Sequence, residues 1–308
     1  MSEGELELPW RLSYFVEPGY LLPVIMGEDN LKNTMQKFEV RDDDVFLVTY
    51  PKAGTNWTCE IIDAIQHVDN LEVLKTRSLI EKTPLMELGP SIHPEIIAEG
   101  VADVPSILEA IHAPSPSPRK LPTHLLPKFL PPQLFTKKPK TIFVDRNPKD
   151  CIVSLFGWHE STRFLARVEW DHFFDAYLKG LTEYGPYPEF IKAWYPYKDE
   201  PWFLWTRYEE LKKDPKGSIK KIAEFLGKNL TEEQLNEIVR ITGFEYMKKA
   251  NENVKGREFI LRPEGVWQRK GVVGGWKGWF TVAQNEAFEK QYNERMKEYG
   301  LEHLKYKF

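Results

Sequence analysis

Short apolar runs alternate with amphipathic stretches along most of the chain. Each run is bounded by loop-forming residues, as is typical of buried parallel strands, and the stretches after them carry apolar residues at helical spacing. The expected strands cover 45–50, 140–146 and 202–208, and the expected helices cover 58–67, 149–156, 216–226 and 231–239. Because strands alternate with helices, we predict an α/β fold with a central parallel sheet flanked by helices.

Two helix starts carry specific sequence signals. Asn147 precedes Pro148, which pairs an N-cap residue with proline at the first helical position. Thr231 is followed three residues later by Gln234, the pattern of a capping box. We therefore expect helices to begin at these two places.

A proline-rich segment between Pro105 and Pro139 could be a linker between two domains. Apolar residues are interleaved with its prolines, however, and strand–helix patterns lie on both sides of it. We therefore expect one domain over residues 1–308, with a rigid loop in this segment. We expect residues 1–37 to form an irregular N-terminal segment packed on that domain.

Composition and charge narrow the possible classes of protein. The chain has 42 basic and 46 acidic side chains, a net charge of −4, which does not fit a polyanion-binding protein. Its two cysteines, Cys59 and Cys151, cannot form a disulfide framework. No apolar run approaches the ~18 residues of a membrane helix, and the start lacks a secretory pattern. We expect a cytoplasmic protein with no nucleic acid or membrane partner and no bound metal.

The loop after the first strand has the position and size of a phosphate-binding loop. Gly54 lets the backbone approach a ligand, Lys52 adds a charge, and the next helix presents free N–H groups. Lys52 precedes the glycine, however, so the Gly-Lys-Ser/Thr ending of P-loop nucleoside triphosphatases is missing. An ordinary strand-to-helix turn would also explain Gly54.

Two further segments combine cations with helix starts or glycines. Arg146 stands at the carboxyl end of the second strand, the edge where open α/β sheets bind ligands, and Ser154 follows two helical turns later. Residues 269–277 contain three cations and three glycines, which suits a loop closing over an anion. The alternatives are a surface ion pair for Arg146 and a solvated turn for 269–277.

Together these segments resemble the cytosolic sulfotransferases. Residues 50–57 are similar to that family's loop for the 5′-phosphosulfate of 3′-phosphoadenosine-5′-phosphosulfate (PAPS), and 146–154 resemble its 3′-phosphate motif. Residues 269–277 resemble its nucleotide clamp, and 277–286 its short dimer motif. The similarity extends from about residue 38 to 299 and implies that PAPS is bound by Lys52, Ala53, Gly54, Thr55, Asn56, Trp57, Arg146, Ser154, Tyr208, Thr242, Phe244, Arg269, Lys270 and Gly271.

The same resemblance places His124 where the family has its catalytic histidine, with Lys52 as the second catalytic residue. A base with a pKa near 7 suits removal of a proton from an acceptor hydroxyl or amine. Among the other histidines, His159 is the main rival because it lies one helical turn after Ser154.

The chain departs from the family pattern at four positions. Pro122 replaces the lysine two residues before the catalytic histidine, so Lys52 must neutralise more of the charge on the transferring group. Gly275 replaces an acidic residue before the clamp tryptophan, which we expect to loosen the clamp. Ala53 and Asn56 stand where serine and threonine are usual.

The resemblance implies a sulfotransferase that transfers a sulfuryl group from PAPS to a small lipophilic acceptor. A P-loop-type phosphotransferase and a non-catalytic nucleotide-binding relative are the alternatives. We expect an apolar acceptor pocket, built by the segment 84–88 and by Phe15, Tyr20, Phe156 and Trp158. The dimer motif implies a weak homodimer through Lys277, Thr281, Val282 and Glu286.

Overall fold

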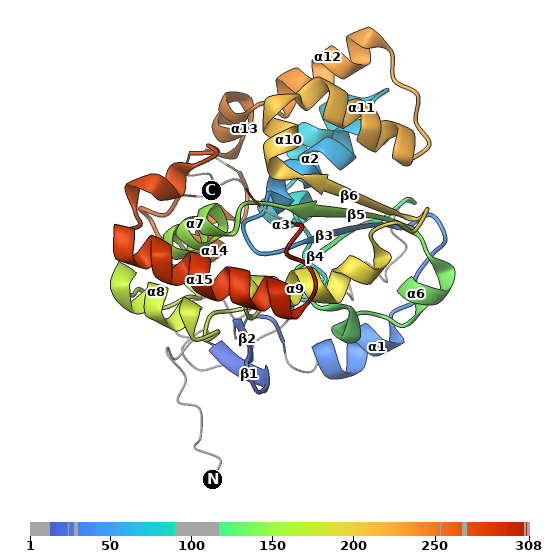
Figure 1. Cartoon of the computed structure of the whole chain (residues 1–308). Helices are drawn as coiled ribbons and strands as arrows, with labels where there is room; N and C mark the ends of the chain where they lie inside the picture. The colour runs from blue at the N-terminus through green and yellow to red at the C-terminus, as the bar shows by residue number, and fades with distance from the viewer. Residues whose placement is uncertain are drawn as a thin grey trace.

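A four-stranded parallel sheet forms the centre of the molecule (Figure 1). The computed structural model describes residues 13–23, 25–27, 30–89, 117–252, 254–266, 270–304 and 306. The strands are β3 (Val45–Thr49), β4 (Lys120–Thr123), β5 (Lys140–Asp145) and β6 (Phe203–Arg207). They lie in the order β4-β3-β5-β6, and Val48 of β3 is paired with Thr123 of β4 on one side and with Phe143 of β5 on the other. The predicted parallel α/β fold is confirmed.

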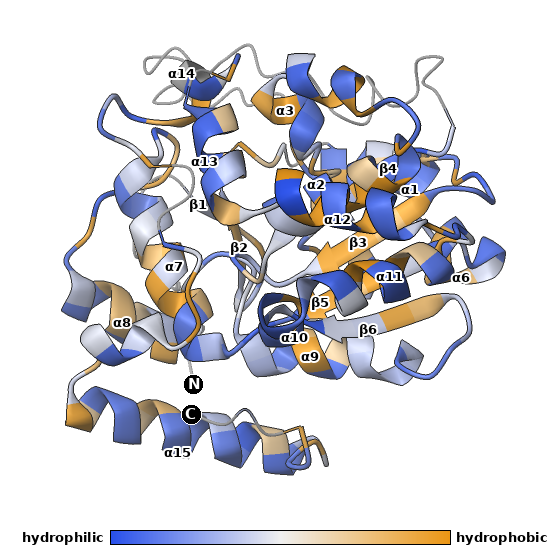
Figure 2. Ribbon diagram, turned by 90° about the horizontal axis from the view of Figure 1, so that it is seen from above, coloured by the Kyte–Doolittle hydropathy of each residue, from blue (hydrophilic) through white to orange (hydrophobic). Residues whose placement is uncertain are grey.

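Each face of the sheet supports its own hydrophobic core, because alternate strand residues point to opposite faces. Val45 and Leu47 of β3 belong to one core, and Phe46 and Val48 belong to the other. Figure 2 shows β3 and β5 as hydrophobic strands between helices that are polar on their outer sides. The first core includes residues of α2 (Thr55–Gln66), α10 (Tyr208–Lys213), α11 (Pro215–Phe225) and α12 (Glu232–Ile241). The second includes residues of α7 (Pro148–Ser161), α8 (Trp170–Leu178), α9 (Tyr187–Trp194) and α15 (Val282–Glu298).

Shorter elements complete the described chain. The strands among them are β1 (Ser13–Glu17) and β2 (Tyr20–Pro23), and the short helices are η1 (Asn30–Thr34), α1 (Met35–Lys37), η2 (Leu71–Thr76), α3 (Leu79–Lys82), η3 (Pro127–Phe129), α6 (Gln133–Lys137), η4 (Tyr195–Tyr197), α13 (Phe244–Asn251), α14 (Arg257–Ile260) and η5 (Gly275–Gly278). Within the described ranges, no helix has the length and apolar character needed to cross a bilayer.

Two parts of the chain differ from the expectation. The segment around Pro122, expected to be a loop, contains β4. Proline is tolerated there because β4 is an edge strand, and the Pro122 carbonyl accepts a hydrogen bond from Met86 (2.9 Å). The N-terminal segment is not irregular throughout, since β1 and β2 pair as an antiparallel hairpin.

Both predicted helix starts are confirmed. The Asn147 side chain accepts a hydrogen bond from the Lys149 N–H (3.0 Å), and Pro148 is the first residue of α7. Thr231 and Gln234 form the reciprocal bonds of a capping box at the start of α12.

Candidate active site

The residues that follow the four sheet strands meet in one cavity of about 240 Å³. Lys52 follows β3, His124 follows β4, Arg146 follows β5 and Tyr208 follows β6. The carboxyl ends of parallel strands share one edge of the sheet, so the topology itself gathers these side chains.

The loop between β3 and α2 has an unusual backbone. Lys52 has a φ of 68° and Gly54 a φ of 115°, both in the left-handed region that side chains disfavour. A Cβ atom at Gly54 would lie 2.8 Å from the Tyr208 ring, so this glycine is required sterically as well. No side chain caps α2, which leaves its first N–H groups available to an anion.

Arg146 joins the two loops on either side of it. Its guanidinium donates to the Lys52 carbonyl (2.8 Å) and to the Val272 carbonyl (3.1 Å). It lies over the Tyr208 ring at 4.2 Å, while its Nε is buried and meets no hydrogen-bond acceptor within the described chain. Arg146 therefore has a donor left for a ligand. It also links the loop after β3 to residues 270–274, which precede η5 and are called the C-terminal loop below.

The C-terminal loop is fixed to the start of α7. The Asp150 carboxylate accepts hydrogen bonds from the backbone of Gly274 (2.7 Å) and of Trp276 (3.0 Å), on both sides of Gly275. A Cβ at Gly275 would lie 3.8 Å from an Asp150 oxygen, so an acidic side chain there would start beside a like charge. Gly271 has a φ of 61°, and a Cβ there would lie 2.6 Å from the Phe244 ring.

Most of the predicted nucleotide-binding residues line this cavity. They are Lys52, Gly54, Thr55, Asn56, Trp57, Arg146, Ser154, Tyr208, Thr242, Phe244, Lys270 and Gly271. Ala53 is buried beside the lining, and Arg269 lies outside the described residues. Lys212 also lines the cavity, and its ammonium lies 5.5 Å from the centre of the Trp57 ring. Lys212 was not among the predicted site residues, although it lies one helical turn after Tyr208.

Only one of the four aromatic residues expected in the acceptor pocket lines the cavity. Trp158 lines the cavity, whereas Phe15, Tyr20 and Phe156 do not belong to its lining. Phe156 instead contacts Trp170 and Trp279, because residues two apart on a helix point in nearly opposite directions. From the segment 84–88, two leucines line the cavity, and the other apolar lining residues include Ile25, Met26, Leu79, Ile80, Leu155, Phe164, Leu165, Met247 and Ile260.

His124 is set up as a proton acceptor. Its side chain is only 8% exposed, and its Nδ1 lies 2.8 Å from the Thr49 carbonyl oxygen. Since a carbonyl can only accept, Nδ1 carries the proton and Nε2 has the free lone pair. Burial, reinforced by the charge of Lys52, lowers the pKa of His124 to about 4, so the ring is neutral at pH 7.

Glu87 contacts the backbone of this histidine. Its Oε1 accepts a hydrogen bond from the His124 backbone N–H (2.8 Å), and burial raises the pKa of the carboxyl to about 7. Thr49 was not predicted as a site residue, and Glu87 was included only as part of the expected pocket segment 84–88. The available signal for Glu87 was a single carboxylate among the apolar residues Leu85, Met86 and Leu88.

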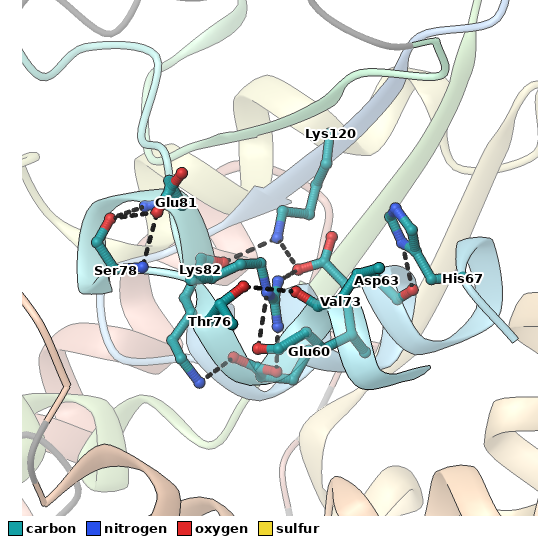
Figure 3. Close-up of polar contacts among 11 residues, drawn as sticks. Glu60, Asp63, His67, Val73, Thr76, Ser78, Glu81, Lys82 and Lys120 are labelled. Atoms are coloured by element: carbon teal, nitrogen blue, oxygen red, sulfur yellow. Dashed lines mark hydrogen bonds and ion pairs between the residues drawn. The ribbon is translucent and has the colours of Figure 1, made fainter. Parts of the chain in front are cut away.

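A buried ionic network holds β4, and therefore His124, in place (Figure 3). The Lys120 ammonium pairs with Asp63 of α2 and donates to the Lys82 carbonyl (2.8 Å). Arg77 pairs with Asp63 and with Glu60 (2.8 Å). Because Lys120 is used here and does not line the cavity, it does not replace the cation that Pro122 removes. The cations that line the cavity in the described chain are Lys52, Arg146, Lys212 and Lys270.

The rival histidine is placed differently. His159 is fully buried, does not line the cavity and uses both ring nitrogens in contacts to Ala166 and Glu183. Over the described ranges, no group of three histidine, cysteine or acidic side chains is arranged to hold a metal ion.

Comparison with known proteins identifies the family. Residues 42–300 match the model of the sulfotransferase domain. Human Sulfotransferase 1C2 is 34% identical over 266 residues, which cover 85% of this chain and 86% of the relative. Mouse Sulfotransferase 2B1 is 35% identical over 297 residues, which cover 94% of this chain and 83% of the relative.

Two solved structures share the fold over most of their length. The mouse sulfotransferase SULT7A1, crystallised with PAP, superposes with a TM-score of 0.75 at 30% identity and covers 95% of this chain and 97% of its own. Retinol dehydratase in complex with androsterone and the inactive cofactor PAP superposes with a TM-score of 0.79 at 25% identity, covering 94% and 89%. The chain belongs to the sulfotransferase family, as its sequence motifs predict.

Proposed function

We propose that this protein transfers a sulfuryl group from PAPS to a hydroxyl or amine of a small lipophilic acceptor. The observation that carries the proposal is that one cavity combines a cationic half with an apolar half. Cations and a helix N-terminus line one half, apolar side chains line the other, and a neutral histidine lines the same cavity. PAP bound in the mouse sulfotransferase and in retinol dehydratase supports the nucleotide assignment.

The chain's own groups account for the chemistry. Nε2 of His124 accepts the proton of the acceptor as the acceptor attacks sulfur. Lys52 and the first N–H groups of α2 stabilise the charge that grows on the leaving 5′-phosphate, and they do so from fixed positions. Arg146 and Ser154 bind the 3′-phosphate, and Trp57, Tyr208, Thr242 and Phe244 contact the adenosine. Arg269, Lys270 and Gly271 close over the nucleotide.

Transfer of labelled sulfate from PAPS to 2-naphthol tests the reaction directly. A steroid alcohol and an aryl amine tested in parallel would define the acceptor class. Label in an organic product supports the proposal. Tight PAP binding without transfer to any acceptor would instead indicate a non-catalytic nucleotide-binding protein.

The protonation of His124 should depend on the nucleotide. In the free protein we expect an imidazole NMR signal that titrates near pH 4 rather than 6.5, because burial disfavours the charged ring. PAP brings negative charge into the cavity, so its binding should raise this midpoint. His124→Gln, which removes the signal, provides the assignment. A midpoint near 6.5 in the free protein would contradict the assigned environment.

The same protonation equilibrium contributes to stability. Between pH 6.5 and about 4 the unfolded chain binds a proton at this histidine that the folded chain does not. His124 therefore lowers the stability of the fold as the pH falls through that window.

We further propose that the protein is cytoplasmic and forms a weak homodimer through the start of α15. Lys277, Thr281, Val282 and Glu286 are all on the surface, and Val282 is 76% exposed. Thr281 also caps α15, accepting a hydrogen bond from the Gln284 N–H. A ten-residue interface is small, so association should depend on concentration.

Sedimentation at micromolar concentration tests the dimer. We expect a monomer–dimer equilibrium for the wild type and a shift to monomer in Val282→Glu, which places a charge in the contact. Val73→Glu, at another exposed valine, is the matched control and should sediment like the wild type. A wild-type protein that is monomeric throughout would contradict the proposal.

A further inference from the structure

A buried ion pair outside the predicted site ties together two segments that border the cavity. His159 lies near the end of α7, and its Nε2 is 3.0 Å from Oε2 of Glu183. The other ring nitrogen, Nδ1, lies 3.0 Å from the Ala166 carbonyl oxygen, and because a carbonyl can only accept, Nδ1 donates this hydrogen bond. Oε1 of Glu183 accepts a hydrogen bond from Ser13 of β1 (2.7 Å). The His159 side chain is fully buried and that of Glu183 is 1% exposed.

The contacts of this pair favour the charged carboxylate. Burial alone would keep Glu183 protonated, but the His159 ring and the Ser13 hydroxyl outweigh it, and the pKa of Glu183 lies below its ordinary value. Removing one partner of such a pair would leave the other as an unpaired buried charge, so the contact is costly to break.

The sequence neighbours of the pair touch both catalytic residues. Trp158 immediately precedes His159, and its ring lies 4.1 Å from the Lys52 ammonium. Tyr184 immediately follows Glu183, and its ring meets the His124 ring edge-on at 5.2 Å between centres. Glu183, Trp158 and Tyr184 all line the cavity.

Tyr184 is also held in a costly backbone conformation. Its φ is 66°, in the left-handed region, and its N–H donates to the Leu21 carbonyl of β2 (2.8 Å). A non-glycine residue stays in this region only where its surroundings hold it there. The anchored Glu183 side chain and the contact with β2 are the surroundings that do so here.

We infer that the His159–Glu183 pair is a positioning device for sulfuryl transfer, which holds Trp158 against Lys52 and Tyr184 against His124. Ser13 extends the device to the N-terminal hairpin. The inference rests on the proposed function, because its consequence for rate presupposes that Lys52 and His124 act in transfer. Neither His159 nor Glu183 takes part in the chemistry itself.

The test compares Glu183→Leu with Glu183→Gln. Leucine removes the side-chain contacts with His159 and Ser13. Glutamine keeps them, because its oxygen accepts from Ser13 and its amide donates to a neutral His159. We expect Glu183→Leu to lower kcat for 2-naphthol by about tenfold or more, as small misplacements of catalytic groups do. The acceptor KM should rise, and Glu183→Gln should restore most of kcat.

Two further variants separate positioning from stability. The double variant His159→Phe with Glu183→Leu leaves no buried charge, so it should fold even if Glu183→Leu does not, and it should show the same kinetic loss. Asp44→Asn breaks another buried ion pair, with Arg119, and should lower the melting temperature without changing kcat or KM. Wild-type kinetics in the double variant would overturn the inference, as would a Glu183→Gln enzyme as impaired as Glu183→Leu.

Amide hydrogen exchange gives a readout that does not need activity. Segments 157–166 and 181–186 should exchange faster in Glu183→Leu than in wild type, and Asp44→Asn should leave them unchanged. A wild type that transfers no label would refute the proposed function, while this exchange result would still decide whether the pair holds the two segments. Unchanged exchange in Glu183→Leu would refute the positioning device.

Discussion

Replacing His124 with alanine should lower kcat by about 10²–10⁴, the usual contribution of a general base. The reason is the orientation of its ring. Nδ1 is committed to the Thr49 carbonyl, so the lone pair on Nε2 is the one available to a bound acceptor. The affinity for PAP should change little, because the proposed site binds the phosphates through the groups that follow β3 and β5.

The measurement is steady-state transfer to 2-naphthol, together with calorimetric titration of PAP. His67→Ala is a suitable control, since His67 is exposed at the end of α2 and away from the cavity lining. An His124→Ala enzyme with wild-type kcat would show that another group removes the proton.

Arg146→Ala should weaken PAP binding by about 10- to 150-fold, since a hydrogen bond to a charged group contributes about 1.5–3 kcal/mol. Lys52→Ala should weaken it as well, because it removes a charge beside the other phosphate. The loss should be larger for Arg146, because its guanidinium also joins the Lys52 and Val272 carbonyls. Arg146→Lys should fall in between, as it keeps the charge but loses the planar fork.

Calorimetry of the three variants with PAP measures these effects. Arg240→Ala removes an exposed arginine that pairs with Glu237 on α12, and it should bind PAP like the wild type. Unchanged affinity in both Arg146→Ala and Lys52→Ala would contradict the nucleotide site.

The sequence allowed the sheet and the nucleotide half of the site to be predicted for a local reason. Lys52 and Arg146 each stand within three residues of the end of an apolar strand, so a short stretch of sequence contains both the structural and the chemical signal. The role of Tyr208 came from the family resemblance. The strand before His124 escaped prediction because it contains Pro122 and pairs only at the sheet edge. His124 was therefore predicted as the base from the family resemblance, because the local sequence pattern did not show that it follows a strand.

The acceptor half depends on contacts between distant segments. Glu87 meets His124 from 37 residues away, and Glu183 meets Ser13 from 170 residues away. Contacts between residues so far apart in the sequence leave no periodic pattern of apolar residues that could reveal them. Phe156 shows a second limit: its residue type suited a pocket, but its helical phase relative to Ser154 and Trp158 directs it into the core.

The way the four strands supply the site has a consequence for how such enzymes can diverge. Each strand contributes a residue within three positions of its end, while the apolar half of the cavity comes from helices and loops outside the sheet. Ile25, Leu85 and Phe164 of that half lie in loops. Insertions and substitutions in those loops can therefore accumulate without shifting the register of the sheet. The acceptor range of this scaffold is free to change over evolutionary time while the donor nucleotide stays the same.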